Sequence, residues 1–196
     1  MAAATEASTS VVARRLTALR QGLDELSAGA GTLDEWADRL LDAFARGGTL
    51  YVAGNGGSAT LASHLVGELV GKYARDRRPL PAVWLGADQC SVTAIANDYG
   101  YASVFERAVA ALTGPSDISI LMSTSGRSEN LLRAAEAAAS TGCATWAMTG
   151  PAPNPLSDLC DTTVSLPGRA AQVQELQQIA VHLICELIDE RLLGAA

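Results

Sequence analysis

The sequence predicts one α/β domain in which helices cover both faces of a doubly wound, parallel five-stranded sheet. Five short apolar runs have the length of buried strands, and they lie at residues 50–53, 82–85, 118–122, 144–148 and 162–166. A turn containing Gly, Ser, Asp or Pro follows each of the first four runs. Segments with helical periodicity, such as residues 128–140, lie between the runs. This alternation is typical of parallel sheets covered by helices.

Helices are expected on both sides of the alternating region. The first is indicated by a stripe with helical spacing, made of Val12, Leu16, Leu19, Leu23 and Leu26. A second helix is expected to start at Thr32 as its N-cap and to stop at Gly47–Gly48. A long last helix is expected at residues 171–193. The apolar stripes of the two terminal helices suit packing against another subunit or against the chain's own sheet.

Length, charge and cysteine usage limit the class of protein. The 196 residues fit one domain, which we place at residues 11–196 after a flexible tail at 1–10. A net charge of −7 argues against a nucleic-acid partner. No apolar run approaches the ~18–20 residues of a membrane span, so no membrane partner is expected. The four cysteines have no zinc-finger spacing, which favours a reduced, cytoplasmic chain.

A glycine-rich turn follows the first predicted strand, in the sequence Gly54-Asn55-Gly56-Gly57-Ser58. Such a turn between a strand and a helix exposes backbone N–H groups and the helix dipole to an anion. It also matches G-x-G-x-x-A, a weak dinucleotide fingerprint that raises a nicotinamide-dependent dehydrogenase as one hypothesis. The turn lacks the lysine of a P-loop. A tight turn without a ligand is the alternative reading.

A second candidate anion site follows the third predicted strand. Residues 123–128 hold four hydroxyl groups and one glycine, on Ser123, Thr124, Ser125, Ser128 and Gly126. Hydroxyl and N–H groups bind phosphate without a lysine, and four hydroxyls exceed what helix capping needs. This turn therefore predicts a monophosphate site.

The only two histidines stand on two different predicted helices. His64 and Glu68 are four residues apart and share a helix face, as do Gln174 and His182, two turns apart. Carboxylate and imidazole are the groups that proton transfer requires. The same four side chains, His64, Glu68, Gln174 and His182, have the donor types that hold Zn²⁺. The sequence leaves open whether the site is metal-free or holds a metal.

Together these residues resemble the SIS (sugar isomerase) domain, a doubly wound, flavodoxin-like fold, here with helical N- and C-terminal extensions. Within it, residues 51–190 resemble the sedoheptulose 7-phosphate isomerases (phosphoheptose isomerases). The motifs, in chain order, are AGNGGSA at 53–59, His64 with Glu68, ANDYG at 96–100, STSGRS at 123–128 and VQELQQIAVH at 173–182.

The resemblance implies an aldose–ketose isomerase of the intramolecular oxidoreductase class. Its substrate would be sedoheptulose 7-phosphate, and its product a D-glycero-D-heptose 7-phosphate with manno configuration, or altro in a biosynthetic variant. Glu68 would be the base and His182 the acid, moving a proton between C1 and C2 through an enediol.

The resemblance also assigns binding residues and partners. Substrate contacts are implied for Asn55, Gly56, Ser58, Asp98, Ser123, Thr124, Ser125, Ser128 and Gln174. Zn²⁺ is the cofactor to which the resemblance points, with no nucleotide cofactor, and the assembly would be a homotetramer with active sites between subunits. Relatives often carry an acidic residue and an arginine where this chain has Ala171 and Gln172, so ring opening and the C2 configuration are not carried over.

The alternative function is a non-catalytic SIS protein. Such a protein binds phosphosugars or associates with the bacterial replication initiator, and that branch lacks the acid/base pair. Both Glu68 and His182 are present here, which favours the enzyme.

Overall fold

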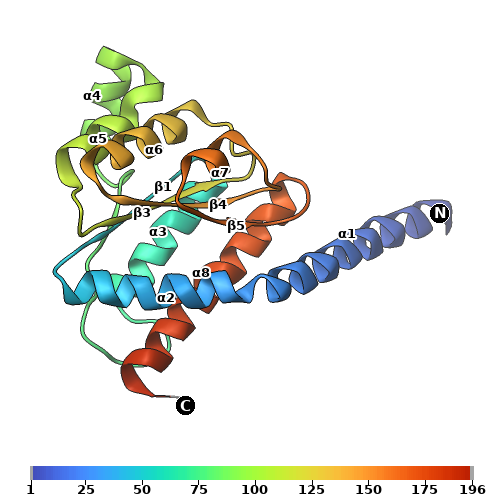
Figure 1. Ribbon diagram of the computed structural model, residues 1–196. Helices are drawn as coiled ribbons and strands as arrows, with labels where there is room; N and C mark the ends of the chain where they lie inside the picture. Colours follow the sequence, from blue (N-terminus) through green and yellow to red (C-terminus); the bar gives the residue numbers. More distant parts are fainter. Residues whose placement is uncertain (1, 195–196) are drawn as a thin grey trace.

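The computed structural model describes residues 2–194, with side chains from Ser10 onward. It confirms the parallel five-stranded sheet, in the order β2-β1-β3-β4-β5 (Figure 1). The strands are β1 (Leu50–Gly54), β2 (Ala82–Trp84), β3 (Ile118–Ser123), β4 (Ala144–Thr149) and β5 (Thr162–Ser165). This is the flavodoxin-like order, in which the chain reverses direction across the sheet between β1 and β3. Ligands of such sheets bind at the carboxyl ends of the strands beside that point.

Helices cover both faces of the sheet because side chains alternate along each strand. They are α1 (Ala2–Ala28), α2 (Ala30–Ala45), α3 (Gly57–Val70), α4 (Gln89–Tyr99), the 3₁₀ turn η1 (Tyr101–Ser103), α5 (Val104–Leu112), α6 (Glu129–Thr141), α7 (Pro155–Leu159) and α8 (Ala170–Leu193). Leu50 and Val52 of β1 pack with α2, α3 and α8 on one face. Tyr51 and Ala53 pack with α5, α6 and α7 on the other.

The start of α2 differs from the prediction. Thr32 was expected as the N-cap, but α2 begins at Ala30, and its N-cap is Gly29 without a side-chain hydrogen bond. The Gly29 N–H bonds to the carbonyls of both Glu25 and Leu26, at 3.1 Å each. The backbone therefore stays close to helical geometry between the two helices, and no side-chain cap is needed to restart it.

α1 extends away from the rest of the chain (Figure 1). It contacts α2 and α8 rather than the sheet. Leu26 at its carboxyl end is buried, whereas Val12 and Leu16 are 55% and 47% exposed. Only the end of the apolar stripe is thus covered by the chain itself. The helix includes residues 2–10, for which a flexible tail was expected, and Met1 lies outside the described residues, so the division into tail and domain stays a prediction.

Within residues 2–194, no helix combines the length and the apolarity needed to cross a bilayer.

Candidate functional site

The two turns expected to bind an anion lie at the carboxyl ends of neighbouring strands. β1 continues through Asn55–Gly56 into α3, and β3 continues through residues 124–128 into α6. The two strands pair up to Gly54, which stands opposite Met122. Both helices therefore begin at the same edge of the sheet, where their free N–H groups attract an anion. At Gly56 the backbone has a φ of +55°, a conformation that favours glycine.

A pair of amide side chains joins the two turns. Asn55 and Asn130 each donate a hydrogen bond to the other's side-chain oxygen, both at 2.9 Å. The hydroxyl of Tyr101 also donates to Asn55 Oδ1, at 2.9 Å. Asn130 is buried and is the second residue of α6. Neither Asn130 nor Tyr101 was predicted as a site residue. The position of Asn130 directly after the hydroxyl-rich turn was the available signal.

The hydroxyl groups of the serine turn divide into two roles. Ser123 is buried, and its Oγ accepts a hydrogen bond from the Gly126 N–H at 3.0 Å, which fixes the shape of the turn. Thr124 and Ser128 are half-buried and Ser125 is exposed. Ser128 is the N-cap of α6, yet its hydroxyl makes no capping bond. Ser125 Oγ accepts from the Arg127 N–H at 3.2 Å, and Ser128 Oγ lies 3.5 Å from Ser123 Oγ. Both hydroxyl oxygens keep further hydrogen-bonding capacity toward a ligand.

Ser58 faces the interior of the protein. Its side chain is 2% exposed, and its Oγ donates to Gln177 Oε1 of α8 at 2.9 Å. Gln177 Nε2 in turn donates to the carbonyl of Met148 in β4, also at 2.9 Å. A contact between Ser58 and a sugar hydroxyl was expected, but in this structure the Ser58 hydroxyl is buried and bonded to Gln177. Ser58 instead connects α3 to α8 and the sheet.

The two histidines of the chain meet between α3 and α8. His64 Nε2 lies 3.0 Å from His182 Nε2, and 3.4 Å from Glu68 Oε1. The side chains of His64 and Glu68 are 39% and 23% exposed, so a substrate can reach them. The structure thus brings one carboxylate and two imidazoles together from two helices, as the helical spacing suggested.

Two further side chains contact His182, and neither was predicted. Gln178 Nε2 lies 2.8 Å from His182 Nε2, and the Tyr73 ring packs on the His182 ring at 5.6 Å between centroids. Burial, followed by the charges of Glu186, Cys185 and Glu68, raises the pKa of the Tyr73 hydroxyl, so it stays protonated. Gln178 precedes His182 by one helical turn, which was a usable signal. Tyr73 follows α3 in a segment without periodicity.

Neither Gln174 nor Asp98 hydrogen-bonds to His64, Glu68 or His182. Gln174 packs against Gly57, and together with Thr60, Leu61, Ala171 and Gln178 it lines a groove of about 550 Å³ between α3 and α8. Asp98 is exposed near the end of α4, where it accepts a hydrogen bond from Asn97 at 2.7 Å. Gln172, beside Ala171, donates to the carbonyl of Ala18 in α1 at 2.6 Å.

The side chains expected to hold zinc fit that ion in kind. Two imidazole nitrogens and a carboxylate oxygen are ordinary zinc ligands. Over residues 10–194, however, no group of three or more His, Cys, Asp or Glu side chains is arranged as a metal site. His64 contacts both Glu68 and His182, and the amide that contacts His182 is Gln178 rather than Gln174.

The chain matches known proteins over most of its length. The SIS domain family matches residues 16–150. A phosphoheptose isomerase of Streptomyces coelicolor is 47% identical over 175 residues, covering 89% of this chain and 76% of that protein. A phosphoheptose isomerase of Solidesulfovibrio magneticus is 42% identical over 167 residues, covering 85% and 81%.

Solved structures agree with these matches. A phosphoheptose isomerase from Francisella tularensis superposes with a TM-score of 0.89 at 30% identity, covering 93% of this chain and 98% of that one. A phosphoheptose isomerase from Neisseria gonorrhoeae gives a TM-score of 0.83 at 31% identity with the same coverage. The chain that carries the fold, the two turns and the paired helices described above is thus similar to these proteins over about nine tenths of its length. The chain belongs to the phosphoheptose isomerases, a family of enzymes built on the SIS domain.

Proposed function

We propose that the chain interconverts sedoheptulose 7-phosphate and a D-glycero-D-heptose 7-phosphate. The observation that carries this proposal is the cluster of Glu68, His64 and His182, in which His64 Nε2 lies 3.0 Å from His182 Nε2 and 3.4 Å from Glu68 Oε1. The names of the relatives support the substrate class, since they are phosphoheptose isomerases.

The proposed chemistry moves one proton between two adjacent carbons of the open-chain sugar. Glu68 removes a proton from C1 of the ketose while His182 donates a proton to the C2 oxygen, which gives an enediol. Glu68 then returns its proton to C2, and His182 takes the proton from the C1 hydroxyl, which leaves the aldehyde. Both side chains end in their starting states. General acid–base catalysis of this kind contributes about 10²- to 10⁴-fold to a rate.

We assign the phosphate group to the serine turn. Thr124, Ser125 and Ser128 offer hydroxyls there, and the free N–H groups at the start of α6 add backbone donors. Asn55, held by Asn130, lies beside this turn and is assigned to the sugar. Because these donors are neutral, they bind a dianion without depending on the chain's net charge of −7.

Zinc is a proposed cofactor. His64, Glu68 and His182 would hold it, with an amide oxygen from Gln174 completing the expected set. When bound, such an ion polarises a carbonyl or hydroxyl oxygen of the sugar.

A homotetramer with sites between subunits is also proposed. Glu68 stands eleven residues after Gly57, which is about 16 Å along α3 from the turns that begin the helix. This separation favours a site in which the turns of one subunit meet the Glu68 and His182 of another. Two surfaces support contact between copies. α4 has no buried residue in the described chain, and α1 exposes Val12 and Leu16.

The C2 configuration of the product is expected to depend on the groove beside Ala171. Relatives often carry an acidic side chain there, and this chain presents only a methyl group. Gln172 bonds to α1 and does not replace the missing charge. We propose a product with manno configuration, or with altro configuration if the chain is a biosynthetic variant.

The cysteines fit the reducing, cytoplasmic environment that we propose for the protein. All four are free of disulfide bonds.

Proton NMR of sedoheptulose 7-phosphate with the purified protein tests the function. We expect a new aldose signal whose couplings identify manno or altro, exchange of the C1 proton in deuterated water, and a rate that falls after treatment with a chelator. The Glu68→Gln variant should bind the sugar phosphate without turnover. Thermal stabilisation by the substrate without C1 exchange in the wild type would instead support a non-catalytic phosphosugar-binding protein.

A further inference from the structure

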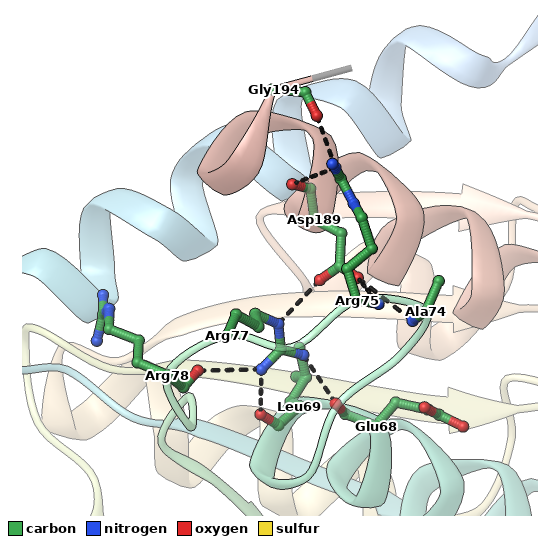
Figure 2. A network of polar contacts seen from close by, with 8 residues as sticks. All are labelled: Glu68, Leu69, Ala74, Arg75, Arg77, Arg78, Asp189 and Gly194. Carbon is green, nitrogen blue, oxygen red and sulfur yellow. Dashed lines mark hydrogen bonds and ion pairs between the residues drawn. The ribbon is translucent and has the colours of Figure 1, made fainter. Parts of the chain in front are cut away.

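An ion pair is buried between the end of α3 and the end of α8. Arg77 Nε donates to Asp189 Oδ1 at 2.9 Å, and the two side chains are 1% and 4% exposed. Figure 2 shows the pair within a wider network of polar contacts. Burying both charges costs desolvation, so an apolar pair of similar volume is often as stable. Stability alone is therefore a weak explanation for the pair, and the groups that it bonds to indicate what else it does.

Arg77 holds the end of α3 that carries Glu68. Its guanidinium donates to the Glu68 carbonyl at 2.8 Å and to the Leu69 carbonyl at 2.9 Å. These carbonyls lie in the last turn of α3, where helix carbonyls lack partners within the helix. Glu68 directs its carbonyl toward Arg77 and its carboxylate away from it (Figure 2). Arg77 thus fixes the backbone of Glu68 and leaves the carboxylate free.

Asp189 holds the opposite side of the network. It lies on α8 seven residues, or about two helical turns, after His182. Its Oδ2 accepts from the backbone N–H groups of Ala74 and Arg75, at 3.4 Å each, and Arg75 donates to its carbonyl at 3.1 Å. The segment after α3 is thereby tied to α8. That segment includes Tyr73, whose ring packs on His182.

We propose that Arg77 and Asp189 are positioning residues for the acid/base pair. Through Arg77 the network sets the end of α3, and through Asp189 it sets α8, so that Glu68 and His182 keep their relative place. The inference rests on the proposed roles of those two residues. The bonds to Asp189, Leu69 and Glu68 come from three different guanidinium nitrogens, Nε, Nη1 and Nη2. The single Nζ of a lysine would not reach all three acceptors at once.

Kinetics of the whole enzyme test the proposal with three variants. Arg77→Lys keeps the charge and loses the simultaneous contacts. The double variant Arg77→Met/Asp189→Leu replaces both charges by apolar side chains. Arg191→Lys is the matched control. Arg191 lies on α8, the helix of Asp189, but it pairs with Asp34 on α2, away from α3. We expect kcat to fall about 10- to 100-fold in the first two variants, with KM within about threefold of the wild type.

The double variant separates positioning from stability. We expect the thermal midpoint of the double variant to lie close to that of the wild type, because the two apolar side chains pack against each other. Its kcat should stay low, because no side chain then bonds to the last carbonyls of α3. A double variant with wild-type kcat would overturn the proposal. An equal loss of kcat in Arg191→Lys would overturn it as well.

A readout independent of turnover uses the histidines. The chain has only two, so a protein labelled with ¹³C at histidine Cε1 gives two imidazole signals. Arg77→Lys should shift both signals, and Arg191→Lys should shift neither. If the wild type does not isomerise the sugar, the proposed function fails, and these signals still decide the positioning role. Unchanged imidazole signals in Arg77→Lys would contradict it.

Discussion

The Nε2 atoms of His64 and His182 lie 3.0 Å apart, although the two residues are separated by 118 positions in the chain. One nitrogen of this contact must donate and the other accept, unless a cation takes the place of the proton. Glu68 reaches the same nitrogen of His64 at 3.4 Å. His64 therefore stands between the two side chains to which we assign the proton transfer.

Replacing His64 by leucine should lower kcat by about 10²-fold, because Glu68 and His182 would lose the group that orients both. KM should change little, since the phosphate turn is on other elements. If zinc is held here, the metal content of the purified variant should also fall. Coupled turnover assays and elemental analysis measure the two effects. Glu190→Gln, an exposed change on α8, is the control and should behave as the wild type.

The amide pair of Asn55 and Asn130 should be energetically coupled. Asn130→Ala is expected to raise KM, because Asn55 would lose the partner that holds it beside the phosphate turn. A double-mutant cycle with Asn55→Ala should give a coupling energy of about 1 kcal/mol in kcat/KM, as for residues in one hydrogen-bonded pair. Effects that simply add would show that the pair does not act as a unit.

The hydrogen bonds between Ser58, Gln177 and the Met148 carbonyl should contribute to stability rather than to binding. Gln177→Leu leaves a hydroxyl and a carbonyl without their partner, and we expect a loss of about 2 kcal/mol in the free energy of unfolding. Ser58→Ala should cost about 1 kcal/mol with KM unchanged. Urea unfolding at one protein concentration measures both, with Glu190→Gln, an exposed change on the same helix, as control. A large rise of KM in Ser58→Ala would return Ser58 to the substrate site.

Buried Cys185 and half-buried Cys160 should make the stability of the fold sensitive to alkaline pH. Burial, followed by a nearby carboxylate, raises the pKa of Cys160 and of Cys185 to about 12, from an ordinary value near 9. Between these values the unfolded chain loses the thiol protons and the folded chain keeps them, so stability falls as pH rises. It is fully retained below pH 9.

The matched comparison is Cys160→Ala/Cys185→Ala. From pH 9 upward, the wild type should lose about 2 to 3 kcal/mol more per pH unit than this variant, about half of it from each thiol, measured by urea midpoints. Parallel pH profiles would show that other groups cause the alkaline loss.

A site shared between subunits predicts complementation. Ser128→Asp places a negative charge in the phosphate turn and should abolish activity, as should Glu68→Gln. Protein refolded from a mixture of the two variants should regain activity, because some interfaces would combine an intact turn with an intact Glu68. Each variant refolded alone is the control. Continued inactivity of the mixture would place the whole site in one subunit.

The strands could be predicted from the sequence because their signals are local. Short apolar runs ending in turns gave all five strands, each within two residues of its end in the structure. The start of α2 was wrong, because the double hydrogen bond of Gly29 replaces the side-chain cap that Thr32 seemed to offer. No helix was predicted at α4, although Asp88 is its N-cap and Val92, Ile95 and Ala96 have the spacing of one helix face. That face is only partly buried, so its apolar pattern is short.

The site could be predicted only as far as single elements reach. The spacing of four residues placed His64 and Glu68 on one helix face. That His182 of another helix contacts His64 could be learned only from the structure. Ser58 was assigned to a ligand because its type suited one, whereas the phase of α3 turns it toward Gln177. Arg77 and Asp189 were missed since their contact spans 112 positions and depends on how two helix ends meet.

The tryptophans give the molecule two separate optical signals. Trp36 of α2 stacks on Trp146 of β4 at 4.8 Å between ring centroids, and both are fully buried. Trp84 on the edge strand β2 is only partly buried, beside a groove lined by Val66 and Val70. Acrylamide should therefore quench the emission of Trp84 first and leave the stacked pair bright. If copies of the chain associate over the β2 edge, Trp84 is covered and acrylamide no longer quenches it. Intrinsic tryptophan fluorescence then reports subunit contact without an added label.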